Sequence, residues 1–449
     1  MKRLLALCLA LCLALCLVLG LVLLPPLSAS AEKAYAFPDC FHVTYTVSER
    51  KTNNGQSFVS KEYVHTTRPE VDKEINGLVD AFDAQFSPGL QRTASPKRNS
   101  RLDVHVVNTR SGDSCLSFLV LARESYNRKQ LRSPFACRVF DMASGEQVAL
   151  VDILGEESEA WDVLAEIAYC ELDGYFADRE ANYAALNDLC RKETLMRTPF
   201  LLRPVCLTLV YEAKTLYPGE TSLIYVTVPY NALRGMMTAY GERQTDNSRY
   251  KMVALTFDDG PVYENTAKVL NALRRNGAQA TFFMIGTQIE ENPDIALRAH
   301  DELHSLQSHH YRHASKSTAD HIQEDTRRME ALMNKTWGLG PWLFRTPYDR
   351  FERFIEAGVD LPMIAYDVDA GDGSGRPPNE VLYTVKKQVH DGAIIRMHDT
   401  VDNAAESCRL VTEWLYENGY MCVTVEELFI HYKQEMVSGE VFCNVTPTY

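Results

Sequence analysis

From Lys251 to the C-terminus the sequence alternates short apolar runs with amphipathic segments, and this alternation constrains the fold more than any other feature. The apolar runs are VALTFD (253–258), ATFFMIG (280–286), ELHSLQS (302–308), WLFRTP (342–347), PMIAYDV (362–368), GAIIRMH (392–398) and YMCVTV (420–425). The segment ENTAKVLNALRRNG (264–277) has helical spacing and ends in a glycine that suits a helix C-terminus. Strands alternating with helices predict an α/β fold of about seven parallel strands, most simply a barrel with its site at the strand carboxyl ends.

The first half of the chain has a different pattern. Phe41 to Val64 and Leu102 to Leu121 are strand-like, whereas Glu159 to Phe176 repeats apolar residues at helical spacing. Two further strands are expected at 207–213 and 222–230. Nothing in this half has catalytic spacing, so we interpret it as a spacer or a wall-binding module.

These patterns divide the chain into four parts. Residues 1–31 are a signal peptide or N-terminal anchor, and residues 32–237 are a separate α+β domain. A polar, turn-rich linker follows at 238–249, and residues 250–449 form the repeating strand–helix domain. We therefore expect residues 251–449 to act on small soluble substrates without the first half.

The N-terminus has the features of an export signal. Lys2 and Arg3 precede an apolar run, residues 4–24, and Ala29-Ser30-Ala31 has the A-x-A pattern of a cleavage site. Because the run is long enough to span a bilayer, an uncleaved membrane tether through residues 4–24 stays open beside a cleaved leader. Both alternatives predict a secreted or cell-surface protein of bacterial type.

The net charge limits the classes of molecule that the protein binds, and the cysteines limit its disulfides and metal sites. The formal net charge of −14 argues against nucleic acid or an anionic membrane surface as the main partner. Of the 12 cysteines, Cys8, Cys12 and Cys16 lie in the leader, which leaves an odd number beyond it. Cys408 and Cys422 are a candidate disulfide pair that spacing alone does not establish. The sequence lacks a C-x-x-C motif, so we do not expect a thiolate metal site.

Polar side chains follow the first and third predicted strands. Asp258 and Asp259 end the first strand, and a Gly-Pro turn follows them. His309 and His313 follow the third strand and are four residues apart. On a helical turn, residues at this spacing share a face, so both imidazoles can reach one metal ion. His310 is expected to point away and is given no role.

Later strands end in polar groups as well. Arg345-Thr346-Pro347-Tyr348 follows the fourth strand, DVDAGDG (367–373) the fifth, and the sixth ends in Met397-His398-Asp399. Polar groups at successive strand ends, all in one half of the chain, indicate a functional site rather than surface decoration.

In this order and spacing the motifs identify a family. Residues 251–432 resemble the polysaccharide deacetylase (NodB-homology) domain of carbohydrate esterase family four, a distorted (β/α) barrel that removes acetyl groups from sugars. The resemblance rests on TFDDGP (256–261), the H-x3-H of 309–313, the R-x-P-Y of 345–348, the aspartates of 369–372 and the ending at 396–398. The first half resembles a domain of unknown function that precedes exported bacterial deacetylases, through features between residues 120 and 236.

The resemblance implies a metal site. It assigns Asp259, His309 and His313 as ligands of one divalent metal ion, usually zinc in this family and sometimes cobalt or manganese. Three protein ligands leave positions open for water and substrate, as a catalytic metal site requires.

The resemblance also implies the acid–base groups. It makes Asp258 the catalytic base, oriented by Arg345, and His398 the acid, partnered by Asp372. It places the backbone N–H of Tyr348 in the oxyanion hole, and it puts Met397 at a substrate-binding position usually occupied by leucine. Gly373 stands where a tryptophan commonly walls the acetyl pocket, so this sequence departs from the family pattern in the acetyl pocket, which bears on the substrate, and not in the metal ligands.

The sequence therefore predicts a metal-dependent hydrolase that removes N-acetyl groups from amino sugars of a polysaccharide, with cell-wall peptidoglycan as the expected substrate. Chitooligosaccharide or acetylxylan deacetylation stays open. A non-catalytic carbohydrate-binding or sensor protein is the alternative from another class. A full set of metal and acid–base positions argues against the non-catalytic alternative.

Overall fold

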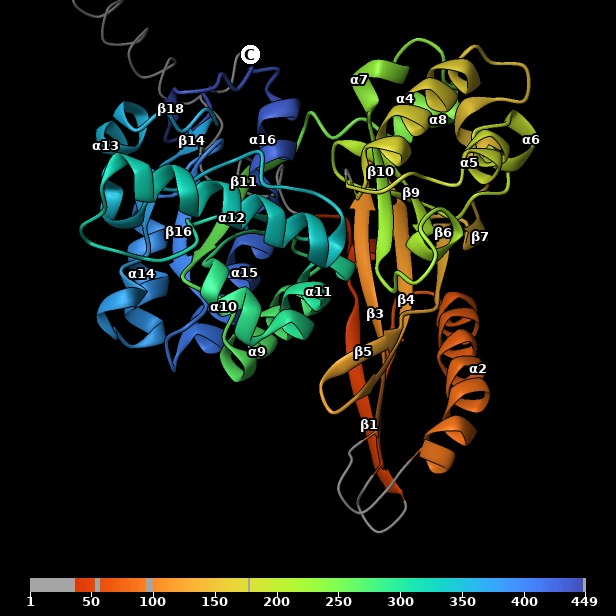
Figure 1. Ribbon diagram of the computed structural model, residues 1–449. Helices are drawn as coiled ribbons and strands as arrows, with labels where there is room; N and C mark the ends of the chain where they lie inside the picture. Colours follow the sequence, from red (N-terminus) through yellow and green to blue (C-terminus); the bar gives the residue numbers. More distant parts are fainter. Residues whose placement is uncertain (1–36, 53–56, 94–99, 177, 447–449) are drawn as a thin grey trace, which may run out of the picture. The chain divides into compact units, whose positions relative to one another are not determined.

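The first sheet of the computed structural model is long, mixed and built by the N-terminal half (Figure 1). Its strand order is β1-β2-β3-β4-β6-β7, with β5 beside β4, and only β2 and β3 pair in parallel. Helix α2 (Pro69–Thr93) packs on it. The strands are β1 (Thr44–Thr52), β2 (Ser57–His65), β3 (Ser100–Ser111), β4 (Cys115–Tyr126), β5 (Lys129–Arg132), β6 (Phe135–Asp141) and β7 (Glu146–Gln147). Strand β3 is buried along most of its length because neighbouring elements cover both faces.

A smaller antiparallel sheet follows, with the strand order β10-β9-β8. Its strands are β8 (Phe200–Leu202), β9 (Cys206–Glu212) and β10 (Leu223–Pro229), and α4 (Ala160–Gly174) packs against β10. The remaining helices here are α3 (Leu150–Leu154), α5 (Tyr183–Leu189), α6 (Lys192–Leu195), α7 (Tyr230–Leu233) and α8 (Ala239–Gln244). The helix and the two strands expected in this stretch are confirmed.

The segment predicted as a linker, 238–249, is packed against the rest of the chain. It contains α8, and the side chains of Gln244 and Asn247 are buried. Asn247 accepts a hydrogen bond from the N–H of Gly112 at 2.9 Å and donates one to the carbonyl of Pro204 at 2.7 Å. The domain boundaries stay predictions.

The C-terminal half forms a parallel sheet flanked by helices. Its strand order is β13-β12-β11-β16-β15, and β17 also pairs with β11. The strands are β11 (Lys251–Asp258), β12 (Thr281–Met284), β13 (Ser305–Ser308), β14 (Met363–Ile364), β15 (Val368–Asp369), β16 (Ile394–His398), β17 (Tyr420–Val423) and β18 (Val441–Phe442). The helices are α9 (Tyr263–Arg275), α10 (Gly286–Glu291), α11 (Pro293–Asp301), α12 (Ala319–Trp337), α13 (Phe351–Glu356), α14 (Pro378–Gln388), α15 (Ala404–Glu417) and α16 (Val425–His431). The chain is thus α/β with mixed sheets.

Two of the predicted strands differ from the structure. Residues 342–347 form no strand, because only Phe344 is bridged, to Ser308 and to Met363. Residues 362–368 divide into β14 and the start of β15, since Ala365–Asp367 leave the ladder between them. The single bridges at Phe344 still connect β13 to β14, so the parallel arrangement continues past β13.

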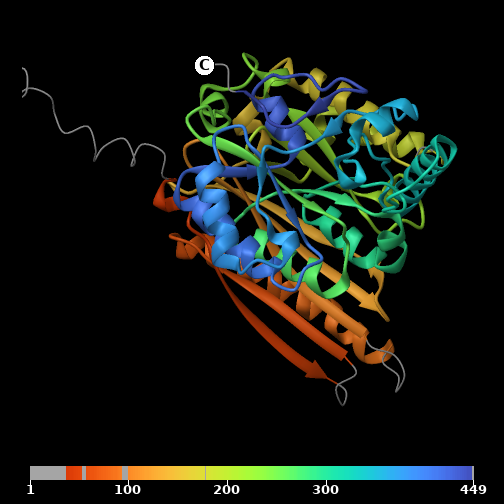
Figure 2. The same cartoon turned by 90° about the vertical axis from the view of Figure 1, so that its left-hand side faces the viewer.

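The two halves share a core and a network of buried charges. One hydrophobic cluster contains Val59 and Leu102 from the first sheet together with Met252 and Leu428 from the second half. Helix α9 lies beside β3, and the long red and orange strands run along the second half in the rotated view (Figure 2). Residues 37–449 are accordingly one compact unit.

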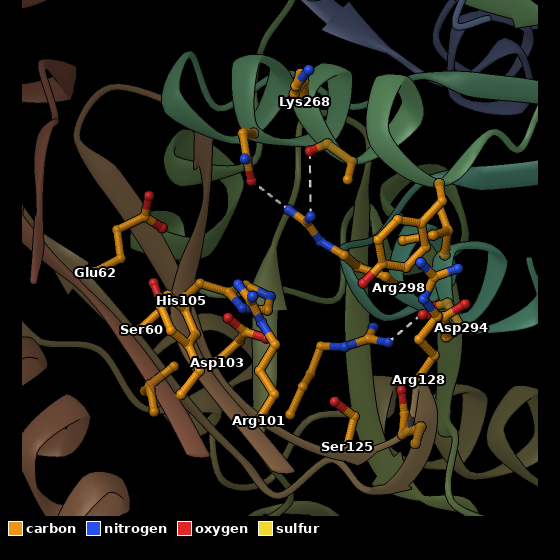
Figure 3. A pocket seen from close by; sticks show the side chains of 18 of the residues that line it. Ser60, Glu62, Arg101, Asp103, His105, Ser125, Arg128, Lys268, Asp294 and Arg298 are labelled. Atoms are coloured by element: carbon orange, nitrogen blue, oxygen red, sulfur yellow. Dashed lines mark hydrogen bonds and ion pairs between the residues drawn. The ribbon is translucent and has the colours of Figure 1, made fainter. Parts of the chain in front are cut away.

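Side chains of both halves line a cavity of about 930 Å³ between the first sheet and helices α9 and α11 (Figure 3). Among its lining residues, Arg274 of α9 contacts Glu62 of β2 at 2.8 Å and Glu302 at 3.0 Å. Arg298 and His105 reach the same Glu302 at 2.6 and 3.1 Å. Glu62, His105, Arg274 and Glu302 are buried, and two of these contacts, Arg274–Glu62 and His105–Glu302, join the first half to the second.

The structure describes residues 37–52, 57–93, 100–176 and 178–446. The predicted leader and tether, residues 1–31 and 4–24, lie outside these ranges. Within them, no helix has the length and apolar character that crossing a membrane requires. Cys408 and Cys422 are both free, like the other described cysteines, so the candidate disulfide between them is not formed.

Candidate active site

The site is built where β11 and β16 end side by side. These strands pair in parallel, with Asp258 opposite His398, so the two side chains emerge from the same edge of the sheet. Asp258 is buried and Asp259 adopts a positive φ of 76°, which turns the two neighbouring carboxylates in different directions. The predicted base and the predicted acid are thereby brought together.

A group of three side chains could hold a metal ion. One ligand atom each from Asp259, His309 and His313 lie within 4.8 Å of one another. Oδ1 of Asp259 is 3.4 Å from Nε2 of His309 and 3.6 Å from Nε2 of His313. Among the described residues this buried Oδ1 has no hydrogen-bond partner, as expected for an oxygen whose partner is a metal ion.

The protonation of these groups also fits a metal site. Nδ1 of His309 lies 2.8 Å from the carbonyl oxygen of Arg345, so Nδ1 carries the hydrogen and Nε2 keeps its lone pair for a ligand. Burial lowers the pKa of His313, helped by the neighbouring His309, which favours the neutral form. Burial raises the pKa of Asp259, but the two imidazoles outweigh it and the net pKa is lowered. The site thus offers one carboxylate and two imidazoles, a donor set that suits a divalent ion such as zinc.

The segment that brings His309 and His313 together is not the helical turn that the sequence predicted. Residues 309–313 form an irregular loop, and His310 has a positive φ of 72°, which is incompatible with a helix. The loop is held by backbone hydrogen bonds, from His309 N–H to Met284 and from Gly286 N–H to His310. His310 points away from the site, as expected, and its ring packs edge-on against Phe344 and Phe354.

Arg345 holds the predicted base in place. It is fully buried and donates from one nitrogen to Oδ1 of Asp258 at 2.8 Å and to the hydroxyl of Thr256 at 2.7 Å. Its other nitrogens donate to the carbonyls of Ile364 and Ala365, both at 2.9 Å. A guanidinium with all these donors engaged is rigid, so it fixes the orientation of the Asp258 carboxylate.

Asp372 holds the predicted acid in a matching way. Nδ1 of His398 lies 3.0 Å from Oδ1 of Asp372, and the backbone N–H of His398 donates to Oδ2 at 2.7 Å. The carboxylate requires the hydrogen on Nδ1, which leaves Nε2 as the nitrogen that faces outward. Burial disfavours the imidazolium, but Asp372 outweighs it, so the pKa of His398 is raised above its usual value.

Three further sequence-predicted positions have distinct environments. Tyr348 has a positive φ of 60°, and its exposed ring lies 4.4 Å from the ring of His313. Met397 points to the opposite face of β16 from His398 and is buried in the hydrophobic cluster, so its side chain is not brought into the site. At Gly373, a Cβ atom would lie 2.8 Å from the imidazole of His398, so a larger residue would displace the ring.

Asp399 was not singled out from the sequence. It is fully buried and accepts a hydrogen bond from the hydroxyl of Thr266 at 2.6 Å, and burial raises its pKa to about 7. A Cβ at Gly260 would lie 2.1 Å from its carboxylate, so the carboxylate fills the space that a side chain at 260 would need. Its position next to His398 in the sequence was the one available signal.

Comparison with known proteins gives a consistent set of similarities. The sequence model described as polysaccharide deacetylase matches residues 245–360. A peptidoglycan-N-acetylglucosamine deacetylase, PgdA of Listeria monocytogenes, is 34% identical over 182 residues, which are 40% of this chain and 39% of that protein. This chain therefore covers about two fifths of that relative's length.

A peptidoglycan-N-acetylglucosamine deacetylase of Bacillus cereus is 31% identical over 206 residues, which are 44% of this chain and 95% of that protein. Among solved structures, the peptidoglycan deacetylase PdaC from Bacillus subtilis has 26% identity and a TM-score of 0.40, and it covers 42% of this chain and 95% of that one.

Proposed function

This chain belongs to the polysaccharide deacetylase family, and from that premise we propose that it hydrolyses the N-acetyl amide of amino sugars in cell-wall peptidoglycan. The observation that carries the proposal is the grouping of three candidate metal ligands with two oriented acid–base pairs at the ends of parallel strands. The wall substrate is taken from the printed names of the relatives, and it agrees with the export signal expected at residues 1–31.

Each group in the site has a defined task in amide hydrolysis. Asp259, His309 and His313 would hold a divalent cation, which supplies Lewis acidity that polarises the acetyl carbonyl and lowers the pKa of water. Asp258, bound and aimed by Arg345, accepts the proton of the attacking water. These residues together generate the nucleophile.

The collapse of the tetrahedral species needs a proton for the leaving amine. His398 carries that proton on Nε2, because Asp372 engages Nδ1 and favours the imidazolium. The backbone N–H of Tyr348 is assigned to the developing oxyanion, a contact commonly worth roughly 3–4 kcal/mol per donor. Met397 packs in the hydrophobic cluster on the opposite face of β16 from His398, so its side chain is assigned no contact with the sugar.

The test is acetate release from N-acetylglucosamine oligomers by the exported chain with zinc, cobalt or manganese, and with a chelator. We expect about one equivalent of bound metal and activity that chelation abolishes. Asp259→Ala should lose both metal and activity, whereas Asp360→Ala, at an exposed carboxylate in the same domain, should lose neither. Metal retained stoichiometrically by Asp259→Ala, or no acetate release under any metal, would overturn the proposal.

A further inference from the structure

A cluster of four side chains adjoins the site and has no role in the mechanism above. Arg396 precedes His398 by two residues on β16, so the two side chains share a face of the strand. One guanidinium nitrogen of Arg396 donates to Asp369 at 2.6 Å and the other donates to Asp349 at 3.3 Å. Tyr366 donates its hydroxyl hydrogen to the same oxygen of Asp349 at 2.7 Å, and the guanidinium lies 4.0 Å from the centre of its ring.

The two carboxylates belong to the turns that carry functional groups. Asp349 directly follows Tyr348, whose backbone N–H is assigned to the oxyanion. Asp369 lies three residues before Asp372, and its Oδ1 accepts the N–H of Gly371 at 2.9 Å, so it shapes the turn that leads to Asp372. Arg396 therefore bridges the oxyanion turn and the turn that orients the acid.

These turns are held in conformations that cost free energy. Tyr348 and Asp349 both have positive φ values, 60° and 53°, a region that is unfavourable for residues other than glycine. Among the described residues the buried Nε of Arg396 has no hydrogen-bond partner, which is a further free-energy cost. Strain of this kind persists only where surrounding contacts impose it, and it concentrates at functional sites.

We propose that Arg396 is a positioning residue that, through Asp349, Tyr366 and Asp369, holds the Tyr348 turn and the Asp372 turn in register with His398. This inference rests on the proposed deacetylation. It assigns no contact with substrate to Arg396. A partly exposed ion pair contributes little to stability, so the effect of the cluster is expected in turnover rather than in folding.

The cluster of Arg396, Asp349, Tyr366 and Asp369, which we call the clamp, is expected to affect kcat more than KM. Misplacement of the oxyanion donor and of the acid by a fraction of an ångström lowers kcat, because both act in the transition state. Substrate binding and metal content should change little, since Asp259, His309 and His313 lie outside the cluster. Arg396→Gln should therefore lower kcat by roughly 10²-fold, with KM and bound metal within about twofold of wild type.

The experiment compares kcat, KM, metal content and Tm for Arg396→Gln, Arg396→Lys, Tyr366→Phe and Asp349→Asn in the full exported chain. Tyr366→Phe removes a single hydroxyl and Asp349→Asn alters an exposed side chain, so both test the clamp even if Arg396→Gln fails to fold. Arg396→Lys retains the charge but cannot reach both carboxylates. Its kcat should recover less than a tenth of the difference between Arg396→Gln and wild type.

Arg409→Gln is the matched control, because Arg409 on α15 also bridges two carboxylates, those of Glu406 and Glu413, both at 2.6 Å. It should leave kcat unchanged. Wild-type kcat in Tyr366→Phe and Asp349→Asn, or equal losses of kcat in Arg396→Gln and Arg409→Gln, would overturn the inference. A wild-type chain without acetate release would instead overturn the proposed function, so the two failures are distinguishable.

Discussion

At the scale of single residues, the two acid–base groups are distinguished by their partners. Asp258 is bound by a buried arginine, whereas His398 is bound by a buried carboxylate. The sequence predicted that both residues lie at strand ends, which meet at one edge of a parallel sheet, and the family resemblance implied their roles as base and acid. It did not predict the tautomers, because they depend on a backbone carbonyl near His309 and on the side chain of Asp372, which only the fold brings close.

The first prediction separates the acid from the base. His398→Ala should lower turnover of an amide substrate by roughly 10²–10⁴-fold, while an activated aryl acetate, whose leaving group needs no proton, should be affected much less. Asp258→Ala should be impaired on both substrates, because the water must lose its proton in either reaction. Equal impairment of His398→Ala on both substrates would show that His398 is not the leaving-group acid.

The second prediction concerns pH. The pKa of His398 is raised, and the proposed acid works in its protonated form, so activity should be present below that pKa and fall as pH rises through it. Asp372→Asn removes the negative partner, so the descending limb of the kcat profile should shift to lower pH. A pH–rate series on the amide substrate measures the shift, and an unshifted limb contradicts the assignment of Asp372.

At the scale of elements, the turn after β11 and the loop after β16 are locked together. The hydroxyl of Thr266 accepts the N–H of Val262 at 2.7 Å and donates to Asp399, and the carboxylate of Asp399 occupies the space beside Gly260. Strand β11 itself was predictable from its apolar run. The absence of a strand at 342–347 and the irregular loop at 309–313 could not be predicted. The single bridges of Phe344 and the positive φ of His310 leave no periodic pattern in the sequence.

The third prediction tests this lock. Gly260→Ala should lower both stability and kcat, because the new methyl group would lie 2.1 Å from the Asp399 carboxylate. Adding Asp399→Ala should recover part of the lost stability, giving a positive coupling in a double-mutant cycle. Gly77→Ala is the control: it lies in α2 with open space around it, and it should be neutral or stabilise by about 0.5–1 kcal/mol. Additive effects of the Gly260 and Asp399 changes would contradict the contact.

At the scale of the whole molecule, the two halves are more interdependent than the sequence suggested. The patterns indicated a change of architecture near residue 250, and that change is real. They did not reveal that Arg274 pairs with Glu62, because partners 212 residues apart in the sequence leave no local signal.

The fourth prediction compares a buried with an exposed partner. Glu62→Gln should destabilise residues 37–449 by roughly 3–5 kcal/mol, because it leaves Arg274 buried with one partner fewer. Glu74→Gln, at an exposed pair with Arg138, should cost less than about 1 kcal/mol. By the same argument a 251–449 fragment should unfold at lower urea concentration than the longer chain. Equal midpoints for the fragment and the longer chain would support independent domains.

Strand β11 is hydrogen-bonded along both edges, to β16 on one side and to β12 and β17 on the other. Amides in such a strand are released to solvent only when the sheet as a whole opens. Deuterium uptake at Thr256 to Asp258 should therefore be among the slowest in the protein and should follow the global unfolding equilibrium. Asp258, the proposed base at the end of this strand, should then be among the last groups to lose its arrangement under denaturing conditions.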